Sequence, residues 1–324
     1  MTVRNVWSLG ATLGEGPVWD ARDAALWFVD IKQHRVHRFD PVSGEMRSFD
    51  APSQVGWVLP AADGGFLAGL QTGLHRFDPE SGAFTLLTAV EPDRPGNRLN
   101  DATVAADGAV WFGSMDDGET DVTGQVHRFH AGTLTTSTIP PVVITNGPAV
   151  SPDGGTLYHV DTLGHTIHAV PVDGATTGTP RLFATIDAAD GYPDGVTVDA
   201  EGGVWVGLWG GWSARRYAPD GTLDRIVRFP GRQHHQGGVR RRRPAHRLRD
   251  QREQGPVRRG SRGPARGRQP VRLRCGRARS RPAAGRDRGL IRGAVSSIAI
   301  ANCFSRRAPA EAGAHVFIIS CARL

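Results

Sequence analysis

Alternating polar and apolar residues recur along the first 230 residues, at a spacing of roughly 40 to 50 residues. The string Val36–Pro41 returns as Leu74–Pro79 and, less completely, as Val126–His130. Weaker copies lie at Ile167–Val170 and Ala214–Tyr217. Such alternation is typical of a half-buried β-strand, because successive side chains of a strand point to opposite faces.

A short apolar segment precedes each copy of the repeat and predicts a second strand. These segments are Leu26–Ile31, Gly65–Leu70, Val110–Met115, Leu157–Asp161 and Val204–Leu208. Most of them follow an acidic residue and a glycine, a pair that supplies the positive φ angles of a tight hairpin. Each unit has the length of one four-stranded blade, and five units are visible. We therefore predict an all-β fold, a β-propeller, with a solenoid as the alternative.

The composition changes abruptly near residue 231. Residues 1–231 hold 15 Lys and Arg against 28 Asp and Glu, whereas residues 232–324 hold 24 against 4. No aromatic residue lies between Phe229 and Phe304. A segment so poor in large apolar side chains cannot bury enough surface to offset its chain entropy. We therefore predict two regions: propeller blades 1–5 over residues 1–230, and a disordered tail rich in Arg, Gly and Pro over 231–324.

The tail has the composition of GC-rich coding DNA that is read out of frame. A back-translation shifted by one nucleotide yields a strand followed by a string like Leu74–Pro79, which would restore a sixth blade. The alternative is a natural basic tail, which would bind polyanions weakly and in a salt-dependent way. The nucleotide sequence near codon 231 distinguishes the two: the shift is excluded if no neighbouring frame encodes a blade.

We expect no targeting segment from this sequence. It has no signal-peptide segment and no apolar run of the length needed to cross a membrane. Cys275, Cys303 and Cys321 all lie in the tail, so the first 274 residues cannot form a disulfide. We expect a cytoplasmic protein without a membrane or nucleic-acid partner; the oligomeric state stays open.

Four strings of acidic and amide residues stand out between the predicted strands. They are Leu13–Trp19 (LGEGPVW), Asn97–Asp101 (NRLND), Thr145–Pro148 (TNGP) and Gly191–Asp199 (GYPDGVTVD). Carboxylate and amide oxygens at the ends of inner strands would point into the axial channel and form a site for a hard cation. His37, His75, His127 and His168 instead recur at one position of the repeat, which favours a structural surface role over metal ligation.

Together the four strings resemble the signature segments of the senescence-marker protein/regucalcin/gluconolactonase family, in the same order and at similar spacing. The resemblance extends over residues 13–230. It implies a six-bladed β-propeller, whose sixth blade is lost or disordered in this chain. It also implies that Val6–Leu13, which would close the ring by pairing with the last blade, has no proper partner here.

The resemblance further implies one divalent metal ion at the propeller axis, Ca²⁺ or Zn²⁺, with Mg²⁺ and Mn²⁺ also possible, held by Glu15, Asn146 and Asp194. Substrate-contacting positions fall on Arg98 and Asn100. A family glutamate that contacts substrate has no clean counterpart; Glu119 is assigned to it, with Asp117 nearby.

The implied activity is metal-dependent hydrolysis of a small sugar-derived lactone to the aldonic acid, as in a gluconolactonase. Asp194 is then the candidate catalytic base. Two alternatives stay open: a calcium-binding propeller of the regucalcin type without catalysis, and a truncated product that is inactive. The same three ligands serve the first alternative, so turnover distinguishes it from an enzyme.

Overall fold

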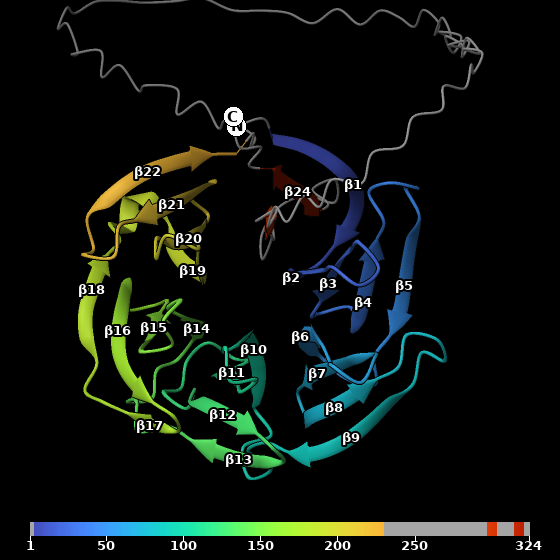
Figure 1. Ribbon diagram of the computed structural model, residues 1–324, viewed down its shortest axis with the longest axis horizontal. Coiled ribbons are helices and arrows are strands. Elements are labelled where there is room, and N and C mark those ends of the chain that lie inside the picture. The colour runs from blue at the N-terminus through green and yellow to red at the C-terminus, as the bar shows by residue number, and fades with distance from the viewer. Residues whose placement is uncertain (1–2, 230–296, 303–313, 321–324) are drawn as a thin grey trace, which may run out of the picture. The chain divides into compact units, whose positions relative to one another are not determined.

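The computed structural model describes residues 3–229, 297–302 and 314–320. In the first of these ranges, five antiparallel blades follow one another along the chain (Figure 1). Hydrogen-bonded order equals sequence order within four of them, so the chain runs from strand to neighbouring strand and then on to the next blade. The predicted all-β propeller is confirmed, and five blades are present.

Each blade begins with its innermost strand. The first blade consists of β2 (Gly14–Asp20), β3 (Ala25–Asp30), β4 (Arg35–Phe39) and β5 (Met46–Asp50). The second consists of β6 (Val55–Pro60), β7 (Phe66–Leu70), β8 (Gly73–Phe77) and β9 (Phe84–Ala89). The third consists of β10 (Asn97–Val104), β11 (Val110–Asp116), β12 (Val126–His130) and β13 (Thr133–Thr136).

The fourth blade differs in that its third strand pairs with two short outer strands. It consists of β14 (Thr145–Val150), β15 (Thr156–Asp161), β16 (Thr166–Asp173), β17 (Thr176–Thr177) and β18 (Arg181–Thr185). A short 3₁₀ helix, η1 (Ala188–Asp190), leads into the fifth blade. That blade consists of β19 (Tyr192–Val198), β20 (Val204–Trp209), β21 (Ser213–Tyr217) and β22 (Leu223–Arg228). The repeated strings predicted from the sequence are the third strands, and the apolar segments are the second strands.

The hydrophobic core lies between adjacent blades. One cluster joins Trp27 and Val29 of the first blade to Phe66 and Phe77 of the second. Another joins Tyr158 and other residues of the fourth blade to the fifth. Because both faces of a blade are covered by its neighbours, its second strand is apolar at nearly every position, and all six residues of β3 are buried.

A β-bulge interrupts the innermost strand of every blade at a similar depth. The register shifts after Glu15 in β2, after Val55 in β6, after Leu99 in β10, after Asn146 in β14 and after Pro193 in β19. A bulge places an extra residue on one strand, bends it and re-aims the neighbouring side chains. Of the predicted site residues, Glu15, Arg98, Asn100, Asn146 and Asp194 therefore lie in or beside the irregular part of an inner strand.

Glycines let these irregular segments approach each other closely. A Cβ atom at Gly56 would lie 2.4 Å from the carbonyl oxygen of Leu99 on the next inner strand. Gly147 has φ +70°, and a Cβ atom there would lie 2.4 Å from Cγ1 of Val196. Larger residues at either position would push two inner strands apart, because backbone or core atoms would have to move.

A sixth, three-stranded sheet contains the N-terminal strand. β1 (Val3–Ala11) pairs with β24 (Ala314–Ser320), which pairs with β23 (Ser297–Asn302). The resemblance implied that Val6–Leu13 lacks its proper partner; in the structure a segment of the tail pairs with β1 instead, because any extended chain can offer N–H and C=O groups to a bare strand edge. Residues 230–296, 303–313 and 321–324 lie outside the described residues, so their predicted disorder stays a prediction.

The recurring histidines are structural, as predicted, but the predicted surface position is wrong for three of them. His37, His75 and His127 are buried. Nδ1 of His37 lies 2.8 Å from Oγ of Ser48, and Nδ1 of His127 lies 3.1 Å from Oγ1 of Thr136. Burial lowers the pKa of His37 to about 4, so this ring is neutral at pH 7 and ties the third strand to the fourth.

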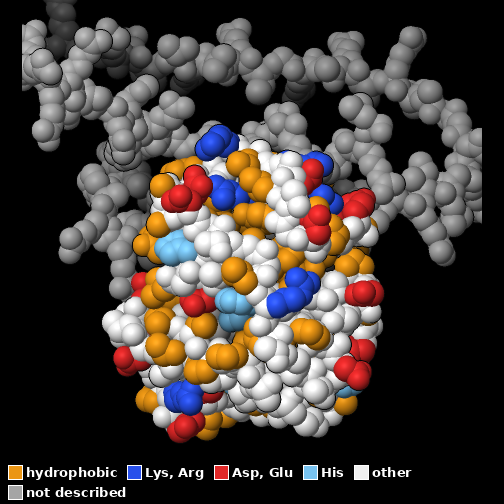
Figure 2. Space-filling view, turned by 90° about the vertical axis from the view of Figure 1, so that its left-hand side faces the viewer, with side chains coloured by type: hydrophobic (Ala, Val, Ile, Leu, Met, Phe, Trp, Pro, Cys, Tyr) orange, Lys and Arg blue, Asp and Glu red, His pale blue; other side chains and the backbone are white. Residues whose placement is uncertain are grey.

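On the face seen in Figure 2, acidic and basic side chains are interspersed with apolar ones instead of gathering by sign. The described part of the chain contains no helix with the length and apolar character that a membrane crossing would require.

Candidate functional site

A cavity of about 610 Å³ lies along the inner strands of the described blades. Its wall takes residues from each of the five inner strands, and from β20 and β21 of the fifth blade. Trp209, at the end of β20, is part of this wall. Glu15, Asp101 and Asp194 are the acidic residues among those that line the cavity.

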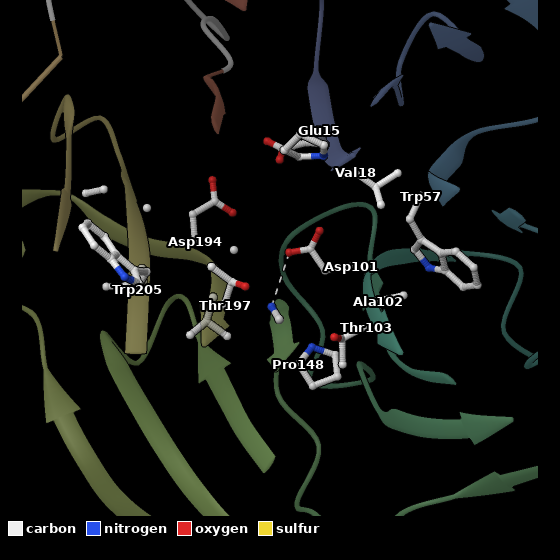
Figure 3. A pocket seen from close by; sticks show the side chains of 18 of the residues that line it. Glu15, Val18, Trp57, Asp101, Ala102, Thr103, Pro148, Asp194, Thr197 and Trp205 are labelled. Atoms are coloured by element: carbon white, nitrogen blue, oxygen red, sulfur yellow. Dashed lines mark hydrogen bonds between the residues drawn. The ribbon is translucent and has the colours of Figure 1, made fainter. Parts of the chain in front are cut away.

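The carboxylates of Glu15, Asp101 and Asp194 are turned toward one common space (Figure 3). They come from β2, β10 and β19, three strands far apart in the sequence. Oδ2 of Asp101 accepts a hydrogen bond from the backbone N–H of Gly147 at 3.3 Å. A Cβ atom at Gly195, next to Asp194, would lie 3.3 Å from the same oxygen. The structure thus brings two predicted ligands together and adds a third acid.

Burial raises the pKa of all three carboxyl groups. The pKa of Glu15 lies well above its usual range because of burial and of the neighbouring Asp194 and Asp101 carboxylates. Burial, with the charge of Asp194, raises the pKa of Asp101 to about 7. Burial raises the pKa of Asp194 to about 6, opposed by the backbone N–H of Gly195 and by Arg98. Like charges crowded in a site of low polarity are relieved by protonation or by a bound cation.

Asn146, the third predicted ligand, is buried beside this group. Its Oδ1 accepts a hydrogen bond from Nδ2 of Asn100 at 3.0 Å, and its own Nδ2 donates to Oγ1 of Thr162 at 2.8 Å. Nη1 of Arg98 donates to Oδ1 of Asn100 at 2.7 Å. The two predicted substrate-contacting residues are thus connected to a predicted metal ligand through hydrogen bonds.

Asp117 connects Arg98 to the first two blades. Its Oδ1 accepts from Nε of Arg98 at 3.0 Å and forms an ion pair with Lys32, and its Oδ2 accepts from Nε2 of Gln54 at 3.1 Å. Burial alone would raise the pKa of Asp117, but the hydrogen bonds from Lys32 and Gln54 hold it below its usual value. Asp117 is therefore a charged partner that fixes the buried guanidinium of Arg98.

Glu119 lies apart from this network. Its side chain is exposed, and its backbone has φ +60° in the turn that follows β11. The structure therefore does not bring Glu119 to Arg98, whereas its alternative, Asp117, contacts Arg98 directly.

The sequence reasoning gave no role to Asp101, although it lies in one of the four strings. On a regular strand, Asn100 and Asp101 would point to opposite faces. The bulge between Leu99 and Ala102 removes this constraint, so both side chains can take part in the same site. The one signal in the sequence that could have identified Asp101 is its position next to Asn100, an amide beside an acid on a predicted inner strand.

Comparisons with known proteins show which family the chain resembles. Residues 13–235 match the family described as "SMP-30/Gluconolactonase/LRE-like region". The chain is 37% identical to L-arabinolactonase of Azospirillum brasilense, over 67% of this chain and 74% of that protein. It is 30% identical to regucalcin of Xenopus laevis, over 67% of this chain and 76% of that protein.

A solved structure shows the same blade arrangement. The calcium-binding protein regucalcin of Agrobacterium tumefaciens superimposes with a TM-score of 0.68 at 31% identity, covering 72% of this chain and 79% of that one. The family match ends at residue 235, close to the change in composition. On the repeat, the described blades and these similarities, the chain belongs to the SMP-30/gluconolactonase/LRE-like family.

Proposed function

We propose that the chain hydrolyses a sugar-derived lactone to the aldonic acid, in the manner of a gluconolactonase. The observation that carries the proposal is the cluster of three partly buried carboxyl groups near the buried Asn146 and Arg98, at the wall of a cavity large enough for a sugar. The lactonases among the relatives, which include an L-arabinolactonase and a 6-deoxy-6-sulfogluconolactonase, support this reaction class.

The donor set suits a hard divalent cation. Glu15, Asn146 and Asp194 offer oxygen atoms, which Ca²⁺ prefers. A cation would stabilise the charged form of carboxyl groups whose pKa values burial raises, and at Glu15 it would also relieve the repulsion from Asp194 and Asp101. Among the described residues, no three His, Cys, Asp or Glu side chains form a ready ligand set, so the three carboxylates that face one space would have to draw closer around a cation. When bound, the cation would supply Lewis-acid polarisation of the lactone carbonyl. We expect Ca²⁺ or Zn²⁺, with Mg²⁺ and Mn²⁺ as further candidates.

The residues of the chain would supply orientation and proton transfer. Asp194, deprotonated above its pKa of about 6, would accept a proton from the attacking water. The oxygen of that water adds to the lactone carbonyl carbon, the ring C–O bond breaks, and the proton ends on the released hydroxyl group. Arg98 and Asn100 would hold the substrate hydroxyl groups and so fix the reacting geometry.

Removal of divalent metal tests this function. We expect the full chain to hydrolyse five- and six-carbon aldonolactones, to lose at least about 90% of that activity in a chelator, and to recover it with added Ca²⁺, Zn²⁺ or Mn²⁺. Proton release measured in a weakly buffered solution follows the reaction. Full activity in the chelator would contradict the metal dependence. Calcium binding without turnover on any aldonolactone would favour the non-catalytic reading, which the calcium-binding regucalcin neighbour supports.

Asp117 and Glu119 offer a paired test of substrate positioning. We expect Asp117→Asn to raise the KM for lactone about tenfold, because Arg98 and Lys32 lose the charge that fixes them. Glu119→Gln, a matched change at an exposed position two residues away, is expected to leave KM within about twofold. A larger effect of Glu119→Gln would return the substrate contact to Glu119.

We also infer that the fold is a six-bladed ring whose sixth blade is incomplete in this chain. Five blades have at least four strands, whereas the sheet that contains β1 has three. The family match stops at residue 235, and the chain spans about three quarters of its relatives. Loss of the sixth blade would weaken the site, because β2 and β19 would lack their common neighbour. If the five remaining blades do not keep the inner strands in place, the product is inactive.

A further inference from the structure

The buried side chains beside the cavity form one hydrogen-bonded series that crosses from the third blade to the fifth. Nη1 of Arg98 donates to Oδ1 of Asn100, and Nδ2 of Asn100 donates to Oδ1 of Asn146. Nδ2 of Asn146 donates to Oγ1 of Thr162, and that hydroxyl donates to the carbonyl oxygen of Pro193 at 3.0 Å. Pro193 directly precedes Asp194, so the series links two predicted ligands.

The direction of this series is fixed at both ends. Arg98 has only donors, so it requires Oδ1 of Asn100 to face it. The carbonyl of Pro193 can only accept, so it takes the single proton of the Thr162 hydroxyl. Thr162 can then only accept from Asn146. A flipped Asn146 amide would place a donor against Nδ2 of Asn100 and leave its oxygen without the Thr162 proton.

We infer that Thr162 is a positioning residue that sets the orientation of the Asn146 side-chain amide. In this orientation Oδ1 is turned away from Thr162 and toward Asn100. A carbonyl oxygen has two lone pairs, so accepting one bond from Asn100 leaves one for a cation or a substrate hydroxyl. The effect of Thr162 on cation binding rests on the proposed metal site, whereas its effect on the orientation of the Asn146 amide does not.

Asn100 acts in the same series, with both of its N–H groups in use. Its Nδ2 donates to Oδ1 of Asn146 and also to the carbonyl oxygen of Thr145 at 2.7 Å. Asn100 therefore holds Asn146 from one side while Thr162 holds it from the other. Partners that orient a ligand in this way are typically worth about 10- to 100-fold in metal affinity.

The test compares Thr162→Val with Thr162→Ser in the full chain. Valine has nearly the same shape but no hydroxyl, whereas serine keeps it. Thr145→Val is the matched control, because Thr145 is also buried and its hydroxyl donates to the carbonyl of Ser114 at 2.7 Å and not to the Asn146 amide. Each of the three variants loses packing or a buried hydrogen bond, so each is expected to lose some stability. An effect that appears only in Thr162→Val therefore cannot come from lost stability alone.

The first readout needs no metal. The sequence contains only five asparagines, so selective ¹⁵N labelling of asparagine gives a sparse spectrum of side-chain amides. The Asn146 signal is identified by its absence from Asn146→Asp. We expect its amide protons to exchange with water at least about tenfold faster in Thr162→Val, and within about threefold of the wild type in Thr162→Ser and Thr145→Val. Unchanged exchange in Thr162→Val overturns the inference.

The second readout is calcium affinity, measured by titration calorimetry with Ca²⁺ alone. We expect Thr162→Val to bind at least about tenfold more weakly, with Thr162→Ser and Thr145→Val within about threefold of the wild type. Equal weakening in Thr162→Val and Thr145→Val overturns the positioning role. If the wild-type chain binds no Ca²⁺, the proposed metal site fails, while amide exchange still decides the role of Thr162.

Discussion

Asp194→Asn is expected to lower kcat/KM for lactone hydrolysis by at least about 100-fold, since a positioned general base typically contributes 10²- to 10⁴-fold. Asp194 lies in the bulge of β19, and its carboxylate is turned toward Glu15 and Asp101 at the cavity wall. Asparagine keeps the size of the side chain but cannot accept the proton of the attacking water. The substitution also removes one negative charge from the proposed cation site.

Initial rates at pH 7.5 with added Ca²⁺ measure this effect, and Asp190→Asn provides the control. Asp190 lies four residues earlier, at the end of η1, where its carboxylate forms an ion pair with Arg215. We expect Asp190→Asn to retain activity within about twofold, because the Asp190 carboxylate is exposed and is not among the residues that line the cavity. An Asp194→Asn variant that stays within threefold of the wild type would remove Asp194 from the chemistry.

Asp101→Asn is expected to stabilise the metal-free chain at pH 8 by roughly 2–4 kcal/mol, since one pKa unit corresponds to about 1.4 kcal/mol. Burial and the nearby Asp194 raise the pKa of Asp101 from its usual value near 4 to about 7. The folded state therefore holds this proton more tightly than the unfolded state. The stability that the protonated carboxyl contributes is complete below pH 4 and is lost as pH rises to 7 and beyond. An asparagine side chain stays neutral at every pH in this range, so the Asp101→Asn variant does not lose this stability as the pH rises.

Thermal unfolding in a chelator at pH 5 and at pH 8 measures the difference. We expect a clear gain in Tm for Asp101→Asn at pH 8 and little change at pH 5. Asp107→Asn is the control of opposite sign, because the backbone N–H of Ala109 and the Arg128 guanidinium lower the pKa of Asp107, so its loss cannot stabilise at pH 8. A destabilised Asp101→Asn at pH 8 would show that Asp101 is held as a satisfied anion without any cation.

Both predictions rest on the same feature: without a bound cation, the clustered carboxylates lower the stability of the folded chain at neutral and higher pH. Natural sites of this kind keep poorly solvated charges for the sake of function. A bound divalent cation would reverse the effect, because Asp101→Asn should then weaken binding while it stabilises the metal-free chain. If Asp101→Asn raises stability but lowers cation affinity, the carboxylates serve cation binding and not the stability of the fold.

Much of the fold could be predicted from the sequence because a propeller repeats one local pattern. The alternation in Val36–Pro41 and its copies identifies the third strand of each blade, and the acidic residue and glycine before most of the apolar segments identify the turn. Both signals are local, so they do not depend on how the blades meet. The burial of His37 and His127 was not predicted, because it depends on the outer strand that hydrogen-bonds each ring.

The candidate site was predicted in part, and the limit has a physical reason. Glu15, Asn146 and Asp194 stand in recognisable strings, so the resemblance was enough to propose them. The placement of Asp101 depends on a bulge and on a contact with Gly147, 46 residues later in the chain. The role of Thr162 depends on a contact with Pro193, 31 residues later. No local pattern reports such contacts, and the choice between Asp117 and Glu119 likewise depended on which side chain reaches Arg98.

By itself, the sequence determined the repeat, the five blades and the change of composition near residue 231, because these follow from local alternation, turn chemistry and charge. The candidate cation ligands came from the acidic and amide strings together with the family resemblance. The tertiary structure alone decided that three carboxyl groups share one cavity, that Arg98, Asn100, Asn146 and Thr162 form a series of fixed direction, and that β24 pairs with β1. These features arise where the inner strands converge, and their geometry is set by bulges and close backbone approach between distant segments.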